Sequence, residues 1–149
     1  ASDVYKRQMP TVEDLRMVLA AYRIRGMLGF RSRRAEVARI RREVTGAVHA
    51  VQPRTVVMVF EGADGASRRR VDRIARHVTR DIRVAATNAV GSDTTVIGLV
   101  VMTGQERDLA ATCVRHVAVE PPERGDGLVF HAADLRRANI YELIEEAVV

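Results

Sequence analysis

The chain has 149 residues, a formal net charge of +5, 47% hydrophobic residues and 29% charged residues, which is typical of one globular domain with a single core. No apolar run approaches the roughly 18 residues needed to cross a bilayer, and no signal peptide is expected at the start. A single cysteine, Cys113, excludes an internal disulfide and is typical of a reducing compartment, so a cytoplasmic location is expected.

The basic charge is almost entirely arginine, because Lys6 is the one lysine among the 24 basic residues. Little lysine together with abundant alanine, valine and arginine is typical of GC-rich coding. The arginine content is therefore partly compositional, and basic charge alone indicates nucleic-acid binding only nonspecifically.

The first 52 residues are predicted to contain a leader and two helices. Residues 1–8 resemble translated sequencing adaptor and are interpreted as a non-native leader. A helix start at Thr11–Asp14 precedes an apolar stripe at helical spacing, and Ser32 is expected to cap a second helix that ends before Pro53. Residues 9–52 are therefore predicted to form a helical hairpin or arm. The two apolar stripes are Leu15, Val18, Leu19 and Tyr22, and Val37, Ile40, Val44, Val48 and Val51.

Residues 53–149 are predicted to form an α+β sandwich domain. The apolar run Thr55–Phe60 is typical of a central strand buried on both faces. Ser67 is expected to cap a helix that ends before a second strand, Ile82–Thr87. Only the short turn at Gly91–Asp93 separates this strand from the next, and a parallel return needs about a dozen residues. The two strands are therefore predicted to form an antiparallel hairpin.

The remaining elements follow the third predicted strand, Thr94–Met102. Thr103 and Glu106 have the spacing of a capping box for a helix. A Pro/Gly loop over residues 120–127 then leads to a fourth strand, Leu128–Ala132. A last amphipathic helix is expected to begin at Asp134 or Asn139.

This order of elements predicts a ferredoxin-like βαββαβ sheet, largely antiparallel, with an N-terminal helical hairpin and a C-terminal helix. The order resembles that of small regulators such as PII and ACT modules. Gly125–Phe130 resembles the PII segment that leads into its last strand. The long nucleotide-binding loop of that family is missing, because residues 89–94 are short, and no binding residue is carried over.

Four acidic residues are expected to follow the first and third predicted strands: Glu61, Asp64, Glu106 and Asp108. Carboxylates at strand ends can gather Mg²⁺ for phosphoryl transfer. The segments Phe60–Asp64 and Thr103–Asp108 resemble the Toprim nuclease and topoisomerase pattern, which has Glu-Gly after one strand and Asp-x-Asp after another. Here Gly104 replaces the first aspartate and Glu106 the second. That family has a parallel sheet, which disagrees with the predicted hairpin.

Other catalytic chemistry is weakly indicated. The four histidines lie on separate predicted elements, without the spacing of a zinc site. Cys113 lies on the buried stripe of its helix, which is unlike an activated thiolate. No cofactor or metal is therefore expected.

Three functions remain open. The first is a non-enzymatic regulatory or assembly module that self-associates, because the helix stripes exceed what one sheet face can cover, so a homo-oligomer is expected. The second is the metal-dependent phosphoryl-transfer enzyme built on the acidic residues. The third is nucleic-acid binding, less favoured because no aromatic platform is evident. Its candidate residues are Arg68, Arg69, Arg73, Arg76 and Arg80.

Overall fold

The computed structural model describes residues 17–26, 29–91 and 93–148. The predicted leader (1–8) and the predicted helix start at Thr11–Asp14 lie outside the described residues. The elements in chain order are β1 (Met17–Arg25), α3 (Phe30–Val51), β2 (Thr55–Ala63), α4 (Arg68–Val90), β3 (Thr95–Val101), α5 (Gly104–Val119), β4 (Val129–His131), the 3-10 helix η1 (Ala132–Arg136) and α6 (Ile140–Val148).

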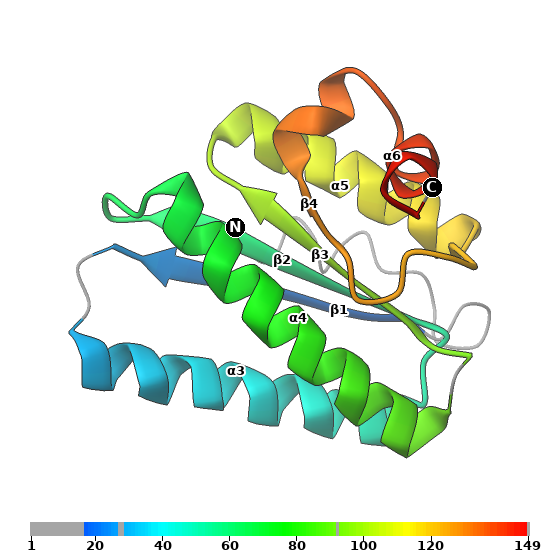
Figure 1. Ribbon diagram of the computed structural model, residues 1–149, viewed down its shortest axis with the longest axis horizontal. Coiled ribbons are helices and arrows are strands. Elements are labelled where there is room, and N and C mark those ends of the chain that lie inside the picture. The colour runs from blue at the N-terminus through cyan, green and yellow to red at the C-terminus, as the bar shows by residue number, and fades with distance from the viewer. Residues whose placement is uncertain (1–16, 27–28, 92, 149) are drawn as a thin grey trace.

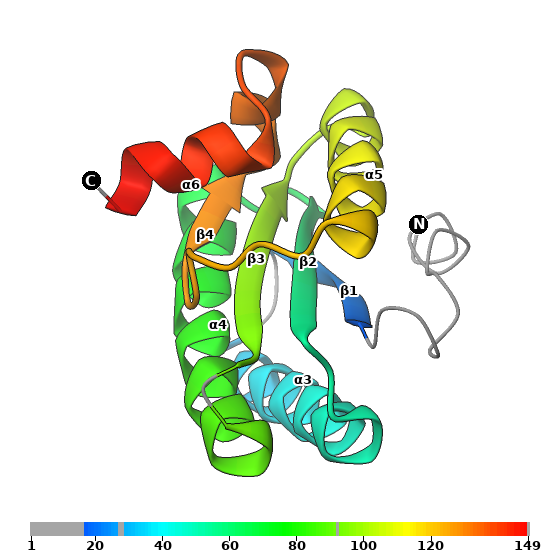
Figure 2. The ribbon, with the colours of Figure 1, turned by 90° about the vertical axis from the view of Figure 1, so that its right-hand side faces the viewer.

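The four strands form one parallel sheet in the order β1-β2-β3-β4, with a helix between each pair of neighbours. The fold is therefore α/β, and the predicted antiparallel ferredoxin-like sheet is wrong. Helices α3 and α4 cover one face of the sheet, and α5, η1 and α6 cover the other (Figures 1 and 2). The likeness in plan to PII and ACT regulators falls with this correction.

The two central strands are buried on both faces, as their unbroken apolar runs predict. Successive side chains of a strand point to opposite faces. On β2, Val56, Met58 and Phe60 pack in the core under α3 and α4, whereas Val57 and Val59 pack under α5. The central position predicted for Thr55–Phe60 is confirmed, because β2 pairs with β1 on one side and β3 on the other.

The first correction concerns residues 17–25, which form strand β1 in place of the predicted helix. Every residue of β1 pairs with β2, from Met17 opposite Thr55 to Arg25 opposite Ala63. Val18 and Leu19 are both buried and lie in the cores on opposite faces of the sheet. An apolar run of this length fits a helical stripe and a two-sided strand equally well by periodicity, and tertiary pairing decides for the strand.

The second correction concerns residues 82–94, where the predicted strand and hairpin are both absent. Helix α4 continues through Ile82 and Ala86, which are 1% exposed, and Val84 is 57% exposed. A strand would place Val84 on the same face as the other two, whereas a helix turns it outward. Gly91, with φ +105°, then ends the helix where the chain turns into β3.

Three of the predicted helix caps are confirmed. Ser67 accepts a hydrogen bond from the backbone N–H of Arg70 at 3.2 Å, and Thr103 accepts one from Glu106 at 3.1 Å. At the start of α6, Asn139 accepts from the N–H of Glu142 and the Glu142 carboxylate accepts from the N–H of Asn139. Helix α3 is confirmed with its buried stripe, but it begins at Phe30 after Gly29, so the prediction that Ser32 caps it is wrong.

The connection through α5 has the opposite hand to the other two. All three connections step in the same direction across the sheet, yet α5 lies on the face opposite α3 and α4. The connections through α3 and α4 are right-handed, as almost all such connections are, and the one through α5 is left-handed (Figure 2). Helix α5 packs over β2 and β3, so residues 120–128 run back across the sheet to reach β4.

Candidate functional site

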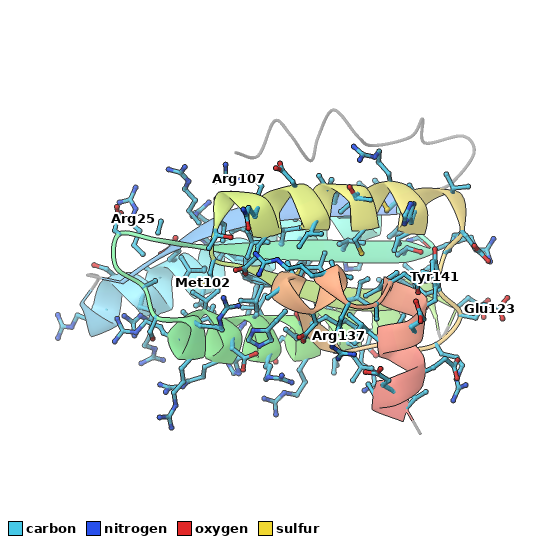
Figure 3. The ribbon with its side chains drawn as sticks, turned by 90° about the horizontal axis from the view of Figure 1, so that it is seen from above. Arg25, Met102, Arg107, Glu123, Arg137 and Tyr141 are labelled. Carbon is cyan, nitrogen blue, oxygen red and sulfur yellow. The ribbon has the colours of Figure 1, made fainter. Side chains whose placement is uncertain are left out.

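The connections change face between α4 and α5, at the carboxyl ends of β2 and β3. Helix α4 leaves β2 toward one face and α5 leaves β3 toward the other. Ligands of parallel α/β sheets bind where neighbouring connections diverge in this way. Figure 3 shows Arg25, Met102 and Arg107 at this carboxyl edge, with Glu123 and Tyr141 toward the opposite end of the molecule.

Two of the four predicted acidic residues are buried at this edge, and each is bound by an arginine. Glu61 at the end of β2 is 7% exposed and accepts hydrogen bonds from Arg107, whose Nε lies 2.9 Å from Oε1. Glu106 in the first turn of α5 is 2% exposed and pairs with both terminal nitrogens of Arg68, at 3.0 and 3.3 Å. Each buried carboxylate is thus paired with a cation.

Glu106 has two further donors. The backbone N–H of Met102 and the hydroxyl of Thr103 donate to its two oxygens at 3.1 and 3.3 Å. Burial alone would raise the pKa of the Glu106 carboxyl, but these hydrogen bonds and the charge of Arg68 lower it below its ordinary value. Glu106 is therefore an ionised carboxylate at neutral pH that joins α5 to α4.

The other two predicted acidic residues lie on the surface. Asp64 is paired with Arg25 at 3.7 Å and both side chains are well exposed, and Asp108 is exposed on α5. Among residues 17–26, 29–91 and 93–148, no group of three or more His, Cys, Asp and Glu side chains could hold a metal ion. The parallel sheet removes one disagreement with the Toprim pattern, whereas the described structure brings no three of these carboxylates together around one metal position.

A histidine and an aspartate that sequence reasoning did not single out meet beside this edge. His131, the last residue of β4, places Nε2 2.7 Å from Oδ1 of Asp72 on α4. Asp72 also accepts from Arg76 at 2.8 Å. Burial raises the pKa of the Asp72 carboxyl, and the hydrogen bonds from Arg76 and His131 outweigh it, so the pKa is lowered. Asp72 is thus ionised and accepts the proton of Nε2. The two residues are 59 positions apart, so no local sequence signal indicates their contact.

Asp72 also lines a groove of ≈ 840 Å³ between α3 and α4 that is rich in arginine and is called the arginine groove below. These two helices lie side by side on the same face of the sheet (Figure 1). Asp72 is the one carboxylate of the lining. The lining residues are Arg33, Arg34, Val37, Ala38, Arg41, Arg69, Asp72, Arg73, Ile74, Arg76, His77 and Arg80.

Four of the five arginines predicted to form a nucleic-acid face line the arginine groove. Arg68 is the exception, because it points to Glu106. Arg76 is paired with Asp72. The three others have neither an ion pair nor a side-chain hydrogen bond within the described part of the chain. These three are Arg69, Arg73 and Arg80.

The opposite wall of the arginine groove belongs to α3. Arg33, Arg34 and Arg41 line it, and Arg41 is paired with Asp81 of α4 at 2.6 Å. Seven arginines from two helices therefore line one groove. Because burial and neighbouring positive charge strengthen the field between such walls, this groove is the part of the described structure best suited to an anion.

Comparisons with known proteins give no further information about the arginine groove. No family model, curated protein or solved structure matches the chain. No helix within the described ranges is both long enough and apolar enough to cross a membrane.

Proposed function

We propose that this protein binds nucleic acid through the arginine groove of α3 and α4. The observation that carries the proposal is the meeting of seven arginines from two helices on one groove with a single carboxylate. The planar guanidinium group donates several hydrogen bonds in a fixed geometry that matches a phosphate. The three partnerless arginines, Arg69, Arg73 and Arg80, are held ready for a ligand, because no internal carboxylate competes for them.

Substitution of these three arginines tests the proposal. The R69Q/R73Q/R80Q variant is expected to bind a labelled oligonucleotide, single-stranded or duplex, at least tenfold more weakly at low salt. Each phosphate contact contributes about 0.7–0.9 to the slope of log K against log salt, so the loss of three contacts lowers the slope by about 2–3. Fluorescence anisotropy between 50 and 200 mM salt, the range over which such contacts typically show, measures both quantities.

A matched control removes the same charge elsewhere. The R124Q/R136Q/R137Q variant also lowers the formal net charge from +5 by 3, to +2, but its residues lie outside the groove and bond to Glu145, Gln105 and Glu146. It is expected to keep most of the affinity and the salt slope. Equal loss in both variants, or no salt-dependent binding by the wild-type protein, contradicts the proposal.

Substitution of Asp72 is expected to strengthen oligonucleotide binding, which is the opposite of the effect expected for the arginine substitutions. Its carboxylate lines the arginine groove and is paired with Arg76, so it both repels an incoming phosphate and occupies one of the arginines. The Asp72→Asn substitution is expected to tighten oligonucleotide binding several-fold at low salt and to steepen the salt slope by about 1, because Arg76 is released to the ligand. Unchanged or weaker binding of the folded variant excludes a ligand that reaches Arg76.

Self-association loses the observation on which it was based. The stripes of α3 and α6 are buried against the sheet, with Ile40, Val44 and Leu143 at most 4% exposed. Among the described residues the exposed large hydrophobic side chains are Val84, Val119 and Val148, and they lie on three different helices. The structure therefore gives neither a regulatory role nor an oligomer any support, and self-association stays a prediction that light scattering at micromolar concentration would test.

A further inference from the structure

The arginine groove has an apolar floor between its two charged walls. Val37 and Ala38 of α3 are half-buried, and Ile74 of α4 is 9% exposed. A ligand that offered only negative charge would leave this floor in water or cover it with polar groups. The composition of the groove thus favours a ligand that carries phosphates and an apolar surface side by side.

We infer that the ligand is single-stranded nucleic acid, with its bases against the apolar floor and its phosphates on the arginine walls. This inference rests on the proposed nucleic-acid binding. A duplex keeps its bases stacked inside and presents sugar and phosphate along its backbone, whereas an unpaired strand has free base planes. Bases of a single strand also stack on guanidinium planes, which the walls supply where aromatic residues are absent.

The spacing of the α4 arginines indicates how many nucleotides the groove can contact. Arg69, Arg73, Arg76 and Arg80 are separated by intervals of four, three and four residues, so they share one face of the helix. From the first to the last there are eleven steps of about 1.5 Å, which is about 16 Å along the helix axis. At about 3.4 Å for each nucleotide of a stacked strand, this row faces about five nucleotides. Affinity is therefore expected to rise with strand length up to about five nucleotides and then to level.

An acidic amphipathic helix also combines apolar and negative groups, but it fits less well. Helices that lie in grooves bind by three or four apolar anchors along one face, whereas this floor has three apolar residues between seven arginines. A phosphodiester strand carries one charge for each nucleotide and matches that excess of guanidinium groups. Sequence preference is expected to be weak, because stacking and phosphate contacts are sequence-tolerant.

An abasic strand separates base contacts from phosphate contacts. Wild-type protein is titrated with a labelled ten-nucleotide single strand, its duplex, and a strand of equal length that lacks its central five bases. The single strand is expected to bind at least tenfold more tightly than the other two at the same salt. The Val37→Ser variant is expected to weaken binding of the intact strand several-fold and to leave duplex and abasic binding unchanged, with circular dichroism confirming the fold.

The outcomes separate the inference from the proposed function. If the duplex or the abasic strand binds as tightly as the single strand, and R69Q/R73Q/R80Q still weakens binding, the groove binds backbone alone and the inference is overturned while nucleic-acid binding stands. Polyglutamate that displaces the strand at equal charge concentration also overturns it, in favour of an acidic polypeptide. If no oligonucleotide binds, both proposals fail together.

Discussion

Replacing Ile82 by alanine is expected to lower the free energy of unfolding by about 2–5 kcal/mol, the usual cost of truncating a fully buried isoleucine. Ile82 is 1% exposed and packs in the core between α4 and the sheet. Its neighbour two residues on, Val84, is 57% exposed, and Val84→Ala is expected to change the free energy by less than about 0.5 kcal/mol. Urea denaturation of the two variants beside the wild type measures both values.

This pair of variants distinguishes a helix from a strand. In the hairpin predicted from alternation, Ile82 and Val84 would face the same side of a sheet, and their truncation would cost similar amounts. In α4 they are 200° apart around the axis, at 100° for each residue of a 3.6-residue turn. A loss at Val84 as large as that at Ile82 would restore the hairpin and the antiparallel sheet.

The two errors in the predicted fold have one physical origin, which is that short apolar runs fit both periodicities. Residues 82–87 alternate apolar and less apolar side chains, but they also extend the buried stripe of Val71, Ala75 and Val78 by one and two further turns. Residues 17–25 form an apolar run like that of Thr55–Phe60, whose pattern predicts the two-sided strand that β2 forms. In both cases tertiary packing decides between helix and strand: residues 82–87 continue α4, and residues 17–25 pair with β2.

The predicted hairpin also led to the wrong sheet topology. Two strands joined by a short turn must be antiparallel, whereas two strands joined through a helix can be parallel. Once α4 extends to Val90, residues 91–94 are an ordinary connection from a helix to a parallel strand. The capping residues Ser67, Thr103 and Asn139 are predicted correctly, because each bonds to a backbone N–H three residues away and so depends on local sequence alone.

In the candidate sites, too, the features set by local sequence are predictable and those set by tertiary packing are not. The stripe of Arg69, Arg73 and Arg80 is visible in the sequence, because helical spacing alone aligns them. The second wall on α3 and the apolar floor depend on which helix packs beside α4. For the acidic residues, the strand ends correctly place Glu61 and Glu106 at one edge of the sheet, but their arginine partners lie 46 and 38 residues away. In the structure each of these two carboxylates is held in an ion pair, Glu61 with Arg107 and Glu106 with Arg68.

Because Glu106 is buried and ion-paired, its substitution is expected to lower the free energy of unfolding strongly. Glu106→Ala is expected to lower the free energy of unfolding by about 2–4 kcal/mol at neutral pH, because it removes a charged acceptor and leaves the N–H of Met102 without its partner. Asp108→Ala removes an exposed carboxylate from the same helix and is expected to cost less than about 0.5 kcal/mol. Similar losses for the two variants in thermal or urea denaturation would contradict a structural role for Glu106.

The Glu106 carboxylate is also expected to make the free energy of unfolding depend on pH. The pKa of Glu106 is lowered in the folded protein from its ordinary value of 4.5, so its contribution is complete above about pH 4.5 and is lost as the pH falls through the folded value. The difference in free energy of unfolding between wild type and Glu106→Gln is therefore expected to be largest near pH 7 and to shrink steadily below pH 4.5. The pKa of Asp72 is also lowered, by Arg76 and His131, which are present in both proteins, so its contribution is expected to cancel in the difference. A difference that stays constant or grows in acid would show that the Glu106 carboxylate is not stabilised by Arg68 in the folded state.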